Sequence, residues 1–114
     1  MDTAAIATEL LTARYKARQM PPISEAAAEF SLEQAYDVAA EILHRRRAAG
    51  EIPVGRKIGF TNRGIWPEYG VNAPIWGYVY DATIRHAEDN AGMQSLRGAL
   101  EPKIEPEIVL KLRN

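Results

Sequence analysis

The sequence contains no cysteine, no long apolar run and almost no net charge. Without cysteine, disulfides, thiolate metal ligands and cysteine nucleophiles are excluded. The first residues include Asp2 and Glu9 and no continuous apolar stretch, which is the pattern of neither a signal peptide nor a membrane span. The formal net charge of −1 provides no basic surface for nucleic acid or an anionic membrane. We therefore expect a cytoplasmic protein without a nucleic-acid or membrane partner.

Two helices are predicted in the first fifty residues. Asp2 or Thr3 can cap the first helix, which Met20-Pro21-Pro22 ends. Its apolar positions recur at helical spacing. They are Ile6, Leu10, Ala13 and Ala17.

The second helix has the stronger signals. Ser31 and Gln34 have the spacing of a capping box, and Gly50 marks the end of the helix. Arg45, Arg46 and Arg47 fall in its last turn, where positive charge complements the helix dipole. We interpret this basic run as structural rather than as a binding patch.

Strand signals follow the helices. Residues 52–60 suggest a short strand and 79–84 another, 85–98 has the pattern of a surface loop, and 104–112 is the most strand-like segment. Helices first and strands after predict an α+β fold with one modest core. We divide the chain into a helical region, 1–50, and the first part of a β-rich domain, 51–114.

Glu105 and Glu107 are the most informative pair in the chain. In a strand, side chains alternate between faces, so the two carboxylates would point the same way. The opposite face would be apolar, with Ile104, Ile108, Leu110 and Leu112. Divalent cations such as Mg²⁺ commonly use one or two carboxylates together with substrate oxygens and water. A solvated acidic strand end explains the same pattern, and Pro106 is compatible with both interpretations.

A second candidate lies upstream, where Lys57 stands between Gly55 and Gly59 in the predicted strand. Glycine allows a ligand to approach the backbone closely, and Thr61 adds a hydroxyl group. A lysine beside a strand is more often simply solvated, so this pattern indicates a site only in combination with others.

Three segments in order resemble the 2-keto-4-pentenoate hydratase group of the fumarylacetoacetate hydrolase family, which includes the 4-oxalocrotonate decarboxylases. They are Gly-Arg-Lys-Ile-Gly-Phe-Thr at 55–61, Ala-Pro-Ile-Trp-Gly-Tyr-Val-Tyr-Asp at 73–81 and Pro-Lys-Ile-Glu-Pro-Glu-Ile at 102–108. The resemblance spans essentially the whole chain but corresponds only to the N-terminal part of a family member. It implies that the β fold continues in about as many residues again.

The resemblance also implies roles for individual residues. Glu105 and Glu107 match two metal-binding acids, whose third partner lies further along the family's sequence, and Lys57 matches an active-site lysine. We place Thr61 and Trp76 near the substrate. The implied cofactor is Mg²⁺ or Mn²⁺.

The implied activity is that of a lyase in aromatic catabolism, a homo-oligomer that adds water to a 2-hydroxy-2,4-dienoate to give a 4-hydroxy-2-oxo acid. One departure weakens the hydratase assignment: Ile75 stands where the family's hydratases carry an acid, and Asp81 is not at the matching position. Decarboxylation of a 4-oxalocrotonate-type acid at the same metal site is the alternative. A non-catalytic fragment or self-associating interaction module is a third.

Overall fold

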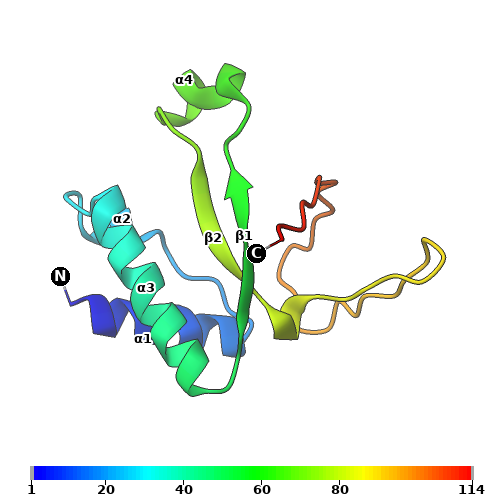
Figure 1. Ribbon diagram of the computed structural model, residues 1–114. Helices are drawn as coiled ribbons and strands as arrows, with labels where there is room; N and C mark the ends of the chain where they lie inside the picture. The colour runs from blue at the N-terminus through cyan, green and yellow to red at the C-terminus, as the bar shows by residue number, and fades with distance from the viewer. Residues whose placement is uncertain (1, 114) are drawn as a thin grey trace.

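The computed structural model describes residues 2–113, in which the helices α1 to α3 lie on one side of a two-stranded antiparallel sheet (Figure 1). The helices are α1 (Thr3–Tyr15), α2 (Ile23–Ala26), α3 (Leu32–Ala48) and the one-turn α4 (Trp66–Tyr69). The strands are β1 (Pro53–Gly59) and β2 (Ile75–Tyr80), and the 3-10 turns are η1 (Arg63–Ile65) and η2 (Asp81–Thr83). The predicted α+β class is confirmed.

Both long helices begin where local chemistry predicts, and α3 also ends where predicted. The Asp2 carboxylate accepts the Ala4 backbone N–H at 2.9 Å and caps α1. Ser31 and Gln34 form the predicted reciprocal capping box of α3, in which each side chain accepts the other residue's backbone N–H. After α3, Gly50 adopts a φ of 91°, a conformation that glycine reaches without a Cβ penalty. Ala17 is a correction: it lies beyond the end of α1, at a φ of 46°, rather than in the helix.

A small apolar core lies between α1 and α3. Its buried members are Ile6, Ala7 and Val38. Half-buried neighbours complete it, namely Leu10, Ile23, Phe30 and Ile42. Burial of these apolar side chains stabilises the packing of α1 against α3. No large side chain among the described residues is completely buried.

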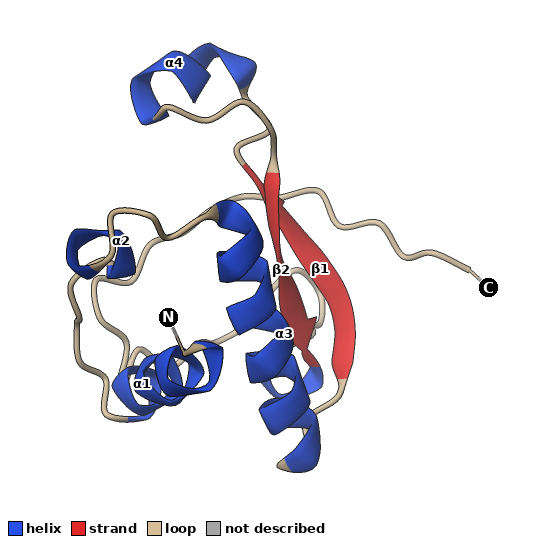
Figure 2. Cartoon of the chain, turned by 90° about the vertical axis from the view of Figure 1, so that its left-hand side faces the viewer, coloured by secondary structure: helices blue, strands red, loops and turns tan. Residues whose placement is uncertain are grey.

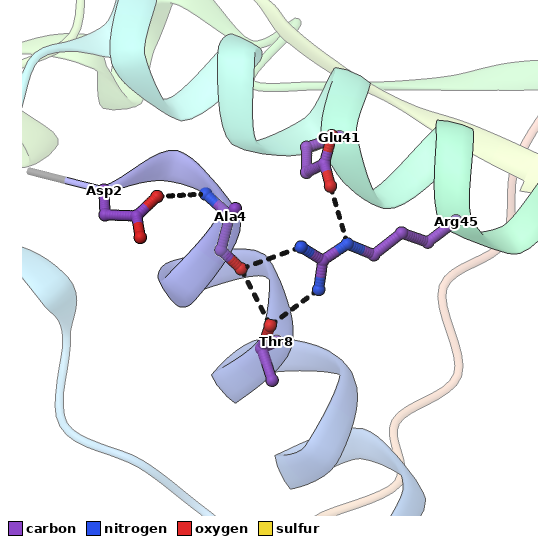
Figure 3. A network of polar contacts seen from close by, with 5 residues as sticks. All are labelled: Asp2, Ala4, Thr8, Glu41 and Arg45. Atoms are coloured by element: carbon purple, nitrogen blue, oxygen red, sulfur yellow. Dashed lines mark hydrogen bonds and ion pairs between the residues drawn. The ribbon is translucent and has the colours of Figure 1, made fainter.

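Two arginines of the last turn of α3 also contact other elements, in addition to the predicted complement to the helix dipole. Arg45 reaches α1, where it donates to the Thr8 hydroxyl at 2.6 Å and to the Ala4 carbonyl at 3.0 Å (Figure 3). Arg46 is 8% exposed, pairs with Glu51 and lies over the ring of Tyr80, 3.5 Å from its centroid. The two side chains therefore tie α3 to α1 and to β2.

The sheet is an antiparallel pair in which Lys57 faces Gly77 and Arg56 faces Tyr78 across the strands. Side chains at directly opposed positions share a face. The face with Arg56, Trp76 and Tyr78 packs toward α3, where Tyr36 stacks on Trp76 with the ring centroids 5.2 Å apart. Lys57 lies on the other face. Figure 2 shows the same division: α3 lies on one side of the hairpin, and the last part of the chain on the other.

The predicted strand at 104–112 is wrong. Residues 102–113 have no regular secondary structure, and Ile104, Ile108 and Leu112 are 87–95% exposed instead of forming a core face. The alternating pattern suits a strand, but a strand needs a neighbour to receive its backbone hydrogen bonds. Within residues 2–113 the sheet has only the strands β1 and β2, and neither pairs with this segment.

The described chain is loosely arranged for its length. Its radius of gyration is 16.0 Å, whereas a compact domain of about 100 residues has one of roughly 13 Å. The turn region around α4 and the segment from 84 onward extend away from the helical layer (Figure 1). Among the described helices, none combines the length and the apolar character needed to cross a membrane.

Candidate functional site

The two acids and the lysine singled out in the sequence meet in the structure. The Lys57 ammonium lies 3.1 Å from a Glu105 carboxylate oxygen and 2.8 Å from a Glu107 carboxylate oxygen. The two carboxylates therefore converge on one positive charge, although they are carried by an irregular segment and not by a strand. The two carboxylates lie close together, as the sequence predicts, but strand alternation is not the cause, and their contact with Lys57 was not predicted.

Lys57 is positioned by the most regular part of the sheet. It is the fifth residue of β1, and its opposite neighbour is Gly77, which has no side chain to cover it. Gly55 and Gly59, two positions away on either side, project toward the same face by strand alternation. A Cβ at Gly55 or Gly77 would have no atom within 4 Å. Three positions around Lys57 on this face are thus glycines without a side chain.

The sequence alone does not identify Gly77 as a residue of this site. The pattern that could have revealed it is the alternation of large and small residues in Trp76-Gly77-Tyr78, where glycine falls on the face opposite the aromatic residues. Its identification as a site residue still depends on the strand register, because only the register places Gly77 opposite Lys57.

The electrostatics of the cluster favour a charged lysine. Hydrogen bonds from its ammonium to the Glu107 and Glu105 carboxylates raise the pKa of Lys57 above its usual value. The lysine and the two acids are all about half exposed, with 46–64% of each side chain accessible. In this arrangement the Lys57 side chain is a cation paired with the two carboxylates.

The other two predicted site residues are not brought to this cluster. Trp76 lies on the opposite face of the sheet, between Tyr36 and Tyr78, with the guanidinium of Arg56 4.3 Å from its ring centroid. Its backbone N–H donates to the Tyr36 hydroxyl at 3.2 Å. These contacts make Trp76 part of the packing between α3 and the sheet.

Thr61 is exposed and follows the end of β1 by two residues. The intervening Phe60 has a φ of 55°, which is uncommon for a bulky side chain and turns the chain sharply at this point. Its carbonyl accepts the indole N–H of Trp66 at 2.8 Å, and its ring meets Tyr69 edge-on. These contacts fix the backbone turn at Phe60 and thereby position the Thr61 hydroxyl beyond the end of β1.

The donor set at the cluster fits a divalent cation. Two carboxylates already lie around a single positive charge, and carboxylate oxygens are the ligands that Mg²⁺ and Ca²⁺ prefer. Within residues 2–113 no group of three or more acidic, histidine or cysteine side chains is gathered in one place. The described residues therefore offer two protein ligands, and further ligands would come from water, from substrate or from other protein atoms.

The face around Lys57 also carries Ile75, which pairs with Gly59. A Cβ at Gly59 would lie 3.5 Å from the Ile75 side chain. Since opposed residues share a face, this isoleucine contributes an apolar group on the same side of the sheet as the lysine. Asp81, by contrast, accepts the Ile52 backbone N–H at 2.9 Å and belongs to the junction between the strands.

Comparison with known proteins identifies the group that this chain resembles. No family model matches the chain. It is 31% identical over 105 residues to a 2-hydroxypent-2,4-dienoate hydratase of Pseudomonas putida, a match that covers 92% of this chain and 46% of the relative. It is 30% identical over 104 residues to a 4-oxalocrotonate decarboxylase of a Pseudomonas strain, covering 91% of this chain and 38% of that enzyme.

A solved structure agrees with the sequence relatives. The 4-oxalocrotonate decarboxylase from Pseudomonas putida G7, complexed with calcium and acetate, superposes with a TM-score of 0.67 at 30% identity. The match covers 70% of this chain and 31% of that one. A second complex of the same enzyme, with magnesium and adipate, matches equally well. The chain thus spans less than half the length of these relatives, and the resemblance read from its three motifs is confirmed.

Proposed function

We propose that this chain, which belongs with the 2-keto-4-pentenoate hydratases and 4-oxalocrotonate decarboxylases, carries two carboxylate ligands and the lysine of a divalent-metal lyase site. The observation that carries the proposal is the convergence of Glu105 and Glu107 on one cation beside a glycine-lined strand. Magnesium and calcium in complexes of the matching structure support Mg²⁺ as the cofactor, and Mn²⁺ is proposed on the same donor chemistry.

The proposed reaction is the addition of water to a 2-hydroxy-2,4-dienoate, giving a 4-hydroxy-2-oxo acid. Glu105 and Glu107 would hold a divalent cation, which would supply a Lewis acid for the substrate. Lys57 is charged and half exposed, so it can pair with the substrate carboxylate and orient it. The bare backbone of Gly55, Gly59 and Gly77 lets a planar conjugated acid lie close to the sheet.

Thr61 is proposed to contribute a hydroxyl group at the end of β1. Phe60 and its carbonyl contact with Trp66 hold the backbone from which the hydroxyl projects. Trp76 is proposed to act indirectly, because it packs under the opposite face of the strand pair rather than beside Lys57.

Decarboxylation is the second candidate, and one observation favours it. Ile75 stands on the same face as Lys57 and leaves an apolar group where the resemblance expects an acid in hydratases. Loss of CO₂ needs no side chain to activate water, so an apolar neighbour suits it. An assay with two substrates distinguishes the two activities. A decarboxylase would release CO₂ from a 4-oxalocrotonate-type diacid, whereas a hydratase would add water to a 2-hydroxy-2,4-dienoate.

The metal site is tested by thermal melts with Mn²⁺ and oxalate, an analogue of a 2-oxo acid. A ligand that binds only the folded chain at a hundredfold excess over its dissociation constant stabilises it by about 2.7 kcal/mol. We expect an upward shift of the melt that is lost in Glu105→Gln and in Glu107→Gln. Glu101→Gln is the matched control, because Glu101 is an exposed acid of the same region. The metal-site assignment is contradicted if Mn²⁺ and oxalate leave the melting temperature of the unaltered chain unchanged. It is also contradicted if they shift the melting temperature equally in all three variants.

Oligomer formation and the cytoplasmic location belong to the same proposal. Homo-oligomers are expected from the resemblance, and small 2-hydroxy-dienoic or 2-oxo acids are the proposed partners of the site. The exposed apolar side chains of 104–112 are available for contacts with further protein.

A further inference from the structure

We propose that Lys57 serves as a built-in cation for Glu105 and Glu107: its ammonium holds the two carboxylates together until a divalent metal replaces it, and the exchange frees the lysine for an anionic ligand. The inference rests on the proposed function, because it takes the two acids as metal ligands. It adds an order of events to that site, with metal first and organic acid second.

The contacts of the final segment carry the first step of the argument. Residues 102–113 have no regular secondary structure and expose almost all their side chains. The two ion pairs with Lys57 are the polar side-chain contacts that join this segment to the sheet within the described residues. Since β1 holds the lysine backbone rigidly, the ammonium determines where the two carboxylates come together.

The second step is that this cation can leave. Its side chain is 49% exposed, and ion pairs at such exposure are weak because water solvates both partners well. The opposite residue is Gly77, so no side chain stands over the stem to confine it. Lysine has a long flexible stem and a compact charge, so the ammonium can swing into solvent without disturbing the strand.

The third step concerns charge. With the lysine in place, the two carboxylates and one ammonium have one net negative charge, which repels an organic acid. When a divalent cation joins them, the same cluster has one net positive charge. At the same time the ammonium loses its two partners and can pair with a substrate carboxylate. Metal binding therefore converts a site that excludes 2-oxo acids into one that attracts them.

The first test compares Mn²⁺ affinities of the whole chain, its Lys57→Met variant and a Lys103→Met control. Removing a competing exposed ion pair should tighten Mn²⁺ binding by about two- to sixfold in Lys57→Met. Lys103→Met removes the same charge two residues from Glu105, where no ion pair is formed, and should change the affinity less than twofold. Circular dichroism confirms that both variants fold.

The outcomes separate the two proposals. If the unaltered chain binds Mn²⁺ through the two acids and Lys57→Met binds it equally or more weakly, the cation exchange is overturned and the metal site stands. Equal tightening in both lysine variants also overturns the exchange, since general charge then explains the effect. If the unaltered chain and Lys57→Met both fail to bind Mn²⁺, the proposed function and the exchange fail together.

A second test observes the lysine directly by NMR. In the metal-free chain the two Hε protons of Lys57 should be inequivalent, because the ammonium is held between two carboxylates. Saturating Mg²⁺ should merge their signals, while those of Lys103 and Lys111 stay unchanged. A Glu105→Gln, Glu107→Gln double variant should show merged signals before Mg²⁺ is added. Persistent inequivalence at saturating Mg²⁺ overturns the exchange.

Discussion

Arg45 connects two helices through a single side chain. Its guanidinium donates to Glu41 on its own helix at 2.7 Å and crosses to the Thr8 hydroxyl and the Ala4 carbonyl on α1 (Figure 3). The Thr8 hydroxyl itself donates to the Ala4 carbonyl at 2.8 Å. These hydrogen bonds add to the small apolar core in joining α1 to α3.

Replacing Arg45 should therefore lower stability more than replacing a neighbouring arginine. We expect Arg45→Met to reduce the free energy of unfolding by about 1.5–3 kcal/mol, the usual range for hydrogen bonds that involve a charged group. Arg47→Met is the control, because Arg47 is exposed in the same last turn and should change stability little. Urea denaturation followed by circular dichroism measures both. Equal losses in the two variants would show that the contact with α1 contributes nothing.

At the scale of elements, α1 and α3 end in the same hydrogen-bond pattern with different residues. After α1, the Arg18 N–H donates to the Ala13 carbonyl and the Ala17 N–H to the Arg14 carbonyl. After α3, the Glu51 and Gly50 N–H groups make the equivalent bonds. Both are Schellman motifs, whose left-handed position favours glycine. The chain has glycine there only after α3.

This difference predicts that substitutions at the two positions change the free energy of unfolding in opposite directions. Ala17→Gly removes the Cβ from a left-handed position and should raise the free energy of unfolding by about 0.5–1 kcal/mol. Gly50→Ala should lower it by about 1 kcal/mol, since a Cβ there meets no other atom within 4 Å and only the backbone conformation is penalised. Thermal or urea unfolding of both variants measures the pair. Changes of the same sign would contradict the explanation.

The elements also show where periodicity misleads. Residues 104–112 alternate as a strand should, and the structure leaves them irregular. Helices satisfy their backbone within one segment, so the caps at Asp2 and Ser31 locate them from local sequence alone. A strand is satisfied only by a neighbour, and the pattern of one segment does not say whether that neighbour is present.

At the scale of the whole molecule, stability and the candidate site belong to different parts of the chain. The helices and the hairpin contain all the buried apolar side chains, whereas residues 102–113 are exposed throughout. The final segment contributes the two carboxylates and little packing. Its loss should remove the site without unfolding the rest.

Deleting residues 102–114 should leave the melting temperature nearly unchanged in the absence of metal. The two lost ion pairs are exposed and contribute about 0–1 kcal/mol each, and the apolar side chains removed are already in water. The stabilisation by Mn²⁺ and oxalate should disappear completely. Melts followed by tryptophan fluorescence report both effects, because Trp66 and Trp76 lie outside the deleted segment. A large drop in the metal-free melting temperature would show that the segment packs on the sheet.

Several features of this protein could be read before its structure was known. The helix caps, the flanking Gly55 and Gly59 of Lys57 and the proximity of Glu105 to Glu107 all follow from residues close together in the chain. The α+β class followed from the order of helical and strand patterns. Local hydrogen bonds and side-chain periodicity act over a few residues, so a sequence displays them directly.

Other features depend on how distant segments meet. The closeness of Trp76 to a site motif in the sequence predicts a position near the substrate, yet the register with β1 turns its side chain toward Tyr36 and away from Lys57. The meeting of Lys57 with the two acids required the chain to cross the open face of the hairpin. Sequence order gives neither the strand register nor the path of a loop, since both result from packing between residues far apart in the chain.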